Sequence, residues 1–98
     1  MIQTEQLTLT VSGGSASTNT KDLRGWCGLI VVTPATSTTQ YDLKLTDESS
    51  VIVYEKTGII GTWRDTTVFP IKGVHTVALT NVSADEAVTF AIADEESP

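Results

Sequence analysis

Apolar and polar residues alternate with a period of two along several parts of the chain. Of all features of the sequence, this alternation most restricts the folds that the chain can adopt. Residues 41–46 show it best, with an inward set of Tyr41, Leu43 and Leu45 and an outward set of Asp42, Lys44 and Thr46. In no window of a dozen residues do apolar positions recur at the spacing of an amphipathic helix. The sequence therefore predicts an all-β protein with little or no helix.

Composition and turn residues support the same fold class. Val, Ile and Thr supply 34 of the 98 residues, and side chains branched at Cβ favour a pleated sheet. The polar run 47–50 joins the alternating segment to the apolar residues 51–54, which predicts a β-hairpin. Short strands are also expected near residues 59–63 and 68–71, and residues 74–80 and 87–93 read as a C-terminal hairpin.

These segments predict seven or eight short strands with turns about every ten residues, which is typical of an antiparallel β-sandwich of the immunoglobulin or jelly-roll kind. A small barrel is the alternative. At 98 residues the chain has the size of one domain, 1–98. Within it, residues 1–20 are a candidate N-terminal arm and linker, and residues 94–98 form an acidic tail that we expect to fray or lie on the surface.

The N-terminal segment has two interpretations. Leu7, Leu9 and Val11 alternate with threonines, and the stretch "SGGSASTNT" that follows has the composition of a flexible, exposed linker. The segment is therefore either a detachable arm or a strand that crosses between sheets. As an arm, it could add to the sheet edge of a neighbouring protein through main-chain hydrogen bonds.

The stretch "DLRGWCGLIVV", residues 22–32, is apolar on both faces. Strict alternation places Trp26, Ile30 and Val32 on one face and Cys27, Leu29 and Val31 on the other. Such a strand is covered on both sides, or by the core on one side and by a partner on the other. The glycines at 25 and 28 are typical of a β-bulge or leave room for the indole.

Charge and cysteine content narrow the possible partners. Six Lys and Arg against twelve Asp and Glu give a net charge of −6, so phosphate backbones and anionic membranes are repelled. We therefore expect no nucleic-acid and no membrane partner. One cysteine cannot form an internal disulfide, and the N-terminus lacks the basic start and apolar run of a signal peptide, so synthesis and folding in the cytoplasm are expected.

The sequence offers little for catalysis. Cys27 and the single histidine, His75, lie on different expected strands, and neither belongs to a recognisable motif. We interpret Cys27 as a core residue and expect the His75 ring at a sheet edge with one nitrogen in water. The acidic pairs 47–48 and 85–86 are typical of solvated turns rather than calcium ligands. We predict no enzyme, no metal and no cofactor.

The remaining candidates for binding are aromatic. Trp63 precedes Arg64 in an irregular part of the chain, where a loop could present the indole to a sugar ring or a protein. Equally, Trp63 could cap one end of the core. The candidate binding residues are therefore Leu7, Leu9, Val11, Trp63 and Arg64.

The runs "YDLKLTDESSVIVYEKTGIIG" and "FPIKGVHTVALTNVSADEAVTFAI" resemble small β-sandwich proteins that tailed bacteriophages encode near their structural genes. The resemblance covers roughly residues 23–92 and leaves residues 7–11 outside the matched pattern. It implies a virion protein, most simply a capsid decoration or cement protein, with a neck or tail accessory protein as an alternative. The implied partner is the major capsid protein or another virion protein, with self-association a further option, and the implied location is the capsid exterior.

Two other function classes remain open at this stage. A carbohydrate-binding module would require Trp26, Trp63 and Tyr54 to line one exposed face. An enzyme would require Cys27, His75 and a carboxylate to meet in an open cleft.

Overall fold

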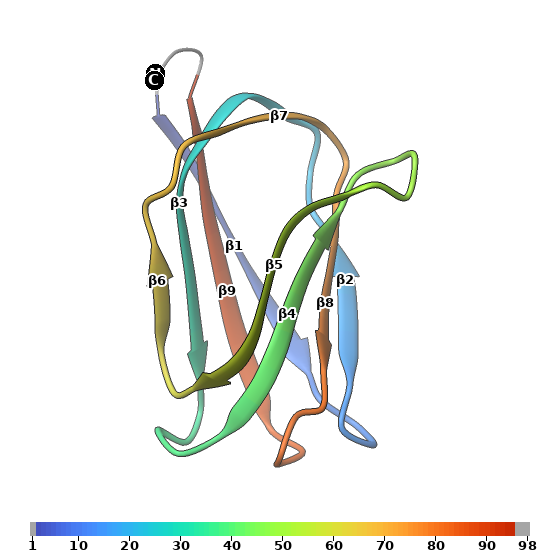
Figure 1. The fold of residues 1–98 in the computed structure, drawn as a ribbon, viewed down its shortest axis with the longest axis vertical. Helices are drawn as coiled ribbons and strands as arrows, with labels where there is room; N and C mark the ends of the chain where they lie inside the picture. Colours follow the sequence, from blue (N-terminus) through green and yellow to red (C-terminus); the bar gives the residue numbers. More distant parts are fainter. Residues whose placement is uncertain (1, 96–98) are drawn as a thin grey trace.

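The computed structural model describes residues 2–95 and, within them, the side chains of residues 4–94. This part of the chain contains strands, turns and bends and no helix, which confirms the all-β prediction (Figure 1). It accordingly has no helix able to cross a membrane. The strands are β1 (Ile2–Thr10), β2 (Ala16–Asn19), β3 (Leu23–Pro34), β4 (Gln40–Thr46), β5 (Ile52–Ile60), β6 (Trp63–Asp65), β7 (Phe69–Gly73), β8 (Thr76–Thr80) and β9 (Ala87–Glu95).

The strands form two antiparallel sheets packed as a β-sandwich. The five-stranded sheet has the order β1-β9-β3-β6, with β7 also paired to β3. The four-stranded sheet has the order β2-β8-β4-β5. The predicted hairpin is confirmed as β4–β5, although β5 contains two register shifts and runs unbroken to Ile60.

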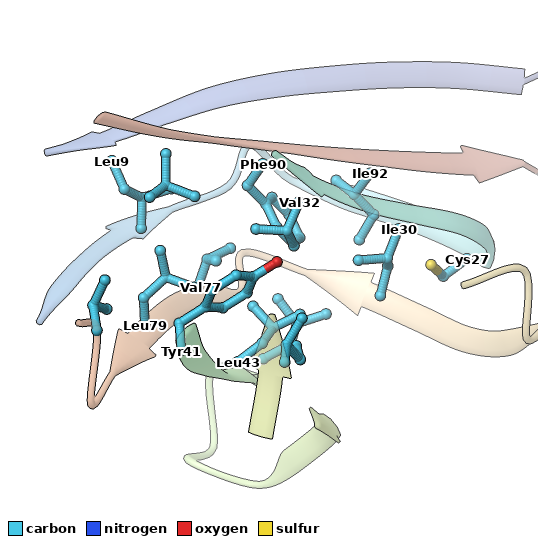
Figure 2. Close-up of a cluster of buried hydrophobic side chains, with 14 of the residues drawn as sticks. Leu9, Cys27, Ile30, Val32, Tyr41, Leu43, Val77, Leu79, Phe90 and Ile92 are labelled. Carbon is cyan, nitrogen blue, oxygen red and sulfur yellow. The ribbon is translucent and has the colours of Figure 1, made fainter. Parts of the chain in front are cut away.

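The core lies between the two sheets. Side chains of the five-stranded sheet, among them Phe90, Ile92 and Val32, point toward Tyr41, Leu43 and Leu79 of the four-stranded sheet (Figure 2). The Tyr41 hydroxyl is buried and donates a hydrogen bond to the Gly61 carbonyl at 2.6 Å. This bond satisfies the one polar atom of the Tyr41 ring and fixes the turn between β5 and β6.

A bulge in β3 overturns the expected division of its faces. The pairing of β3 with β9 shifts register between Cys27 and Leu29, so one extra residue enters the strand at Gly28. Beyond the bulge the side-chain alternation is reversed, and Cys27 shares the core face with Ile30 and Val32. Trp26, Leu29 and Val31 point the other way. The predicted bulge is thus confirmed, whereas the assignment of Trp26 and Cys27 to faces was wrong.

The expected C-terminal hairpin is also wrong. β8 pairs with β2 and β4, whereas β9 lies between β1 and β3 in the other sheet. The connecting segment crosses from sheet to sheet and is held by backbone bonds from Val82 N to Gly14 O and from Ser83 N to Gln40 O, each 2.9 Å. These long-range contacts cannot be deduced from the local pattern.

Two smaller expectations also differ from the structure. Residues 16–19 of the supposed linker form β2, which raises the number of strands in the described chain to nine. Asp94, assigned to a fraying tail, is only 4% exposed in β9, and its Oδ2 accepts the Arg24 N–H at 3.1 Å. Residues 96–98 of that tail lie outside the described residues. Polar residues concealed the strand character of β2 and of the last two residues of β9, where backbone pairing extends the sheet.

Candidate interaction surface

The side of the five-stranded sheet that faces away from the core has an unusual composition, and we call it the outer face. Residues directly opposite in an antiparallel pair share a face, so the register identifies its members. Twelve uncharged side chains lie on it: Thr4, Gln6, Thr8 and Thr10 of β1, Ala87, Thr89, Ala91 and Ala93 of β9, and Trp26, Leu29, Val31 and Thr33 of β3. The charged residues Arg24 of β3, Arg64 of β6 and Lys72 of β7 lie on the same side of the sheet, at its border. All nine strands of the described chain belong to the two sheets, so no strand covers this face.

None of these twelve side chains carries a charge, although the protein is strongly acidic. The charged neighbours on the β6–β7 flank are basic: Arg64 lies opposite Val31, and Lys72 lies opposite Arg24. Arg24 also makes an exposed 3.2 Å ion pair with Asp22. Among the described side chains, the outer face therefore has an uncharged centre and a basic flank formed by Arg24, Arg64 and Lys72, on a molecule of net charge −6.

The two long edge strands differ in regularity. β1 pairs with β9 through all nine of its residues without a register shift, and no strand of the described chain pairs with its other edge. β5 is the corresponding edge of the four-stranded sheet, but two register shifts interrupt it. Its Glu55 pairs with Lys44 at 3.9 Å, and its Lys56 lies 5.0 Å from the centre of the Trp63 ring. Bulges and charges are common means of protecting a strand edge, and β1 has no bulge and one charged residue, Glu5.

Side chains close the seam between β5 and the β6–β7 flank. The Trp63 indole N–H donates to the Tyr54 hydroxyl at 2.8 Å, and that hydroxyl donates to Asp65 Oδ2 at 2.6 Å. The Tyr54 ring stacks on Phe69 with a centroid distance of 5.9 Å. Burial, followed by the bond to Asp65, raises the pKa of Tyr54 to about 12. The bond from Tyr54 is the main reason that the pKa of Asp65 is lowered.

The predicted binding residues Trp63 and Arg64 therefore lie on opposite faces of β6. Trp63 lies opposite Val32, packs against the core and donates its only polar hydrogen to Tyr54. Arg64 points outward and joins the basic flank. Trp26 lies on the outer face, so Trp26, Trp63 and Tyr54 do not line one surface, which a carbohydrate-binding module would require.

The candidate arm residues point inward. Leu9 and Val11 are 2% and 3% exposed in the core, and Leu7 packs partly against it. In this structure the segment is an edge strand of the sandwich, and what it exposes is its backbone edge and its threonines. A role of the three side chains in binding a partner remains a prediction.

Cys27 and His75 are both buried. Burial raises the pKa of the Cys27 thiol to about 11, which keeps it protonated and unreactive at neutral pH. The His75 ring is 1% exposed and its Nδ1 lies 3.0 Å from the Gly73 carbonyl, so the expectation of a ring half in water was wrong. The His75 backbone is bound to Thr20, since the Thr20 N–H donates to the His75 carbonyl at 2.8 Å and the His75 N–H donates to Thr20 Oγ1 at 3.0 Å.

A cleft of about 860 Å³ opens at one end of the sandwich and is lined by Asp22, Arg24, Gly25, Asp47, Glu48, Ser49, Val53, Pro70, Ile71, Lys72, Gly73 and His75. Cys27 is not among these residues, so the thiol and the imidazole do not meet in this cleft. The charges around the cleft are mixed. The Glu48 carboxylate is already engaged in a hydrogen bond within the chain, because its Oε1 accepts the Val74 N–H at 2.9 Å.

The acidic pairs of the turns hold the loops together. Asp85 accepts the N–H groups of Gly13 and Gly14, each at 3.3 Å, and Asp47 Oδ1 accepts those of Ser49 and Val51 at 2.9 Å. Glu86 Oε2 accepts the Thr36 N–H at 2.8 Å, and this bond is the main reason that its pKa is lowered. No group of three or more candidate metal ligands occurs in the part of the chain that the structure describes.

No known protein family and no curated protein sequence matches the chain. Among solved structures it is similar to PliG of Aeromonas hydrophila, a periplasmic inhibitor of g-type lysozyme, with 15% identity and a TM-score of 0.49 over 92% of this chain and 82% of that one. It is also similar to VP2 of the infectious bursal disease virus subviral particle, with 15% identity and a TM-score of 0.34 over 98% of this chain and 33% of that one. At these values the likeness assigns no function to the chain.

Sequence reasoning missed the outer face as a unit. Its one signal was the second apolar side of residues 22–32, which predicted either a second layer or a partner. The bulge at Gly28 hid which side chains form that surface, and the crossing of β9 between β1 and β3 hid the neighbouring threonines and alanines.

Proposed function

We propose that this chain is a structural virion protein of a tailed bacteriophage, a decoration or cement protein that binds the outer capsid surface through protein–protein contacts. The observation that carries the proposal is the neutral, uncovered outer face of the five-stranded sheet. Its apolar side chains Trp26, Leu29 and Val31 are half-buried and its exposed side chains are mostly threonines, and depletion of charge is typical of the central part of a surface that binds another protein. The resemblance of residues 23–92 to phage β-sandwich proteins supports the virion setting.

The size of the outer face suits a docking role. Neighbouring strands lie ~4.8 Å apart and rise ~3.4 Å per residue, so four strands as long as β9 present roughly 600 Å² in projection. Stable protein complexes bury about 800 Å² on each partner. The outer face and its basic flank together are of this order, which supports a contact that persists on a particle.

The distribution of charge favours the outside of the capsid. An acidic protein is repelled by the packaged DNA, whereas a neutral face with a basic flank can approach another protein with little electrostatic cost. Arg24, Arg64 and Lys72 would then lie at the border of the contact, where acidic groups of the capsid protein can meet them.

The test is binding to capsids of the phage that encodes the chain, prepared without this protein. Ala91→Arg places a long cation at the centre of the outer face, and we expect at least a tenfold loss of bound protein. Ala78→Arg is the matched control, because Ala78 is likewise half-buried and points outward from a central strand of the other sheet. We expect it to change binding less than twofold. Equal binding by both variants, or no binding by the unmodified protein, would contradict the proposal, and labelling bound protein at the neck or tail would move it to that site.

A further inference from the structure

We propose that two copies of this chain pair edge to edge through β1, with an antiparallel β1–β1 ladder centred on Gln6. The inference goes beyond the proposed function and does not depend on a phage setting. It starts from the open edge of β1, a regular nine-residue strand whose outer backbone N–H and C=O groups pair with no other strand among residues 2–95. Such an edge is a ready template for another strand.

The other strand edges of the described chain are less suitable. β5 is interrupted by two register shifts and carries Lys56 at its centre, and β2 has only four residues. β6 has three residues, and β7 contains Pro70, which has no N–H to donate. β1 has no proline, and within it the one charged residue is Glu5, whose two oxygens accept the Lys21 N–H at 3.0 and 2.9 Å. The carboxylate is therefore held by its own chain.

Symmetry and strand length together select the register. A two-fold axis perpendicular to the sheet keeps core-facing residues on the core side in both copies, so it must pass through a pair of equivalent residues. Because β1 spans Ile2–Thr10, an axis at Gln6 pairs all nine residues. An axis at Glu5 would place two carboxylates opposite each other, and an axis at either Glu5 or Leu7 leaves two residues of each strand unpaired.

The side chains in this register are compatible across the ladder. Gln6 opposes Gln6 of the partner subunit, where two amides can exchange hydrogen bonds, and Thr4 opposes Thr8 of the partner subunit. Glu5 opposes Leu7 of the partner subunit, so like charges do not meet. The adjacent edge, β2, contributes Ala16, Ser17, Thr18 and Asn19 and carries no charge. Two molecules of net charge −6 can therefore approach on this side with little repulsion.

Pairing of this kind would join the two five-stranded sheets into one. The two outer faces would then form a single continuous surface, and a dimer could bind a repetitive lattice at two points. Two linked contacts hold far more firmly than one, so a modest affinity of each outer face would suffice.

The experiment measures the mass of the protein by sedimentation equilibrium over a concentration series. The unmodified chain is expected to shift from 10.5 kDa toward twice that mass as concentration rises. Gln6→Lys places two cations opposite each other at the axis and is expected to weaken the dimer at least tenfold, although it lowers the net negative charge. Thr57→Lys, an exposed position on β5 at the opposite edge with the same change of charge, is the control and should retain the dimer. Gln6 is itself exposed, so neither change disturbs the core.

A mixture of two variants tests the register directly. Gln6→Glu alone should also be monomeric, and mixing it with Gln6→Lys should restore a dimer that contains one copy of each. A monomeric unmodified chain at every concentration, an undiminished Gln6→Lys dimer, or a mixture that stays monomeric would each overturn the proposal. Residue 91 lies opposite Gln6 in the β1–β9 pair, so the mass of Ala91→Arg is measured as well, and an Ala91→Arg dimer that does not bind capsids separates the two results.

Discussion

The edge strands of the two sheets lie next to each other on two sides of the sandwich, and the two sides differ in how far their strand edges are protected from pairing with another chain. On the β5–β6–β7 side, Tyr54, Trp63 and Phe69 fill the seam and Asp65 accepts the Tyr54 hydroxyl. On the β1–β2 side, the strand edge is regular, its one charged residue is Glu5, and its exposed side chains are threonine and glutamine. The first side is sealed by side chains, whereas the second leaves backbone groups available to a partner.

This difference indicates that, in a small sandwich, one side can contribute packing that stabilises the fold while the opposite side remains available to bind a partner. Aromatic packing, bulges and paired charges on the sealed side reduce the chance that a foreign strand pairs there. The open side is available for association because core residues next to it, such as Leu9 and Val88, are already buried within the single copy. The predictions below test this division by changing one side at a time.

The largest effect is expected from Tyr54→Ala on the sealed side. The substitution removes the stacking on Phe69, the bond from Trp63 and the bond to Asp65 together. We expect the free energy of unfolding to fall by about 3 kcal/mol, as measured by urea denaturation. Thr8→Ala on the open side should cost less than about 1 kcal/mol, because Thr8 is exposed. Equal losses from the two variants would show that the sealed side contributes no special stability.

A smaller loss in the free energy of unfolding is expected from Gly61→Ala, which changes the turn between β5 and β6 on the sealed side. Gly61 has a φ of 73°, and an added Cβ would lie 2.6 Å from the Ser37 carbonyl oxygen. Strain and the steric clash together should cost about 2 kcal/mol. Gly58 is the matched control, since its φ is 67° but nothing lies within 4 Å of the added Cβ. Gly58→Ala should therefore cost only the backbone strain of about 1 kcal/mol, and identical melting temperatures for the two variants would argue against the clash.

The parts of this fold that sequence reasoning found are those with a local signal. The alternation at residues 41–46 and the polar turn after it predicted the β4–β5 hairpin, because adjacent strands need only a turn and a matching pattern. The burial of Cys27 followed in the same way from its apolar strand. Both outcomes depend on residues within a few positions of one another.

The parts that failed depend on contacts between distant residues. The partners of β8 and β9 are set by the loop contact between Val82 and Gly14, and the faces of β3 are set by one extra residue at Gly28. Trp63 was equally compatible with a loop and with the core, and only the position of the Tyr54 hydroxyl decides between them. The outer face combines three strands from opposite ends of the chain, so no single stretch of sequence contains it.

The smallest expected effect is on the stability of the fold in acid, and it depends on the hydrogen-bonded Asp65 carboxylate of the sealed side. Hydrogen bonds from Tyr54 and Thr67 lower the pKa of Asp65 below its ordinary value of 3.8. A carboxyl whose pKa is lower in the folded than in the unfolded chain stabilises the fold above the unfolded value, and this contribution is lost as the pH falls through the folded value. The melting temperature should therefore be level near neutral pH and fall below about pH 4, with Glu86 and Asp42 contributing in the same direction. Asp65→Asn should make this fall shallower, and Tyr54→Phe, which removes the strongest bond to the carboxylate, should do the same, because the folded pKa of Asp65 then lies closer to its unfolded value. Superimposable acid profiles for the three proteins would show that the hydrogen-bonded Asp65 does not couple the sealed edge to folding.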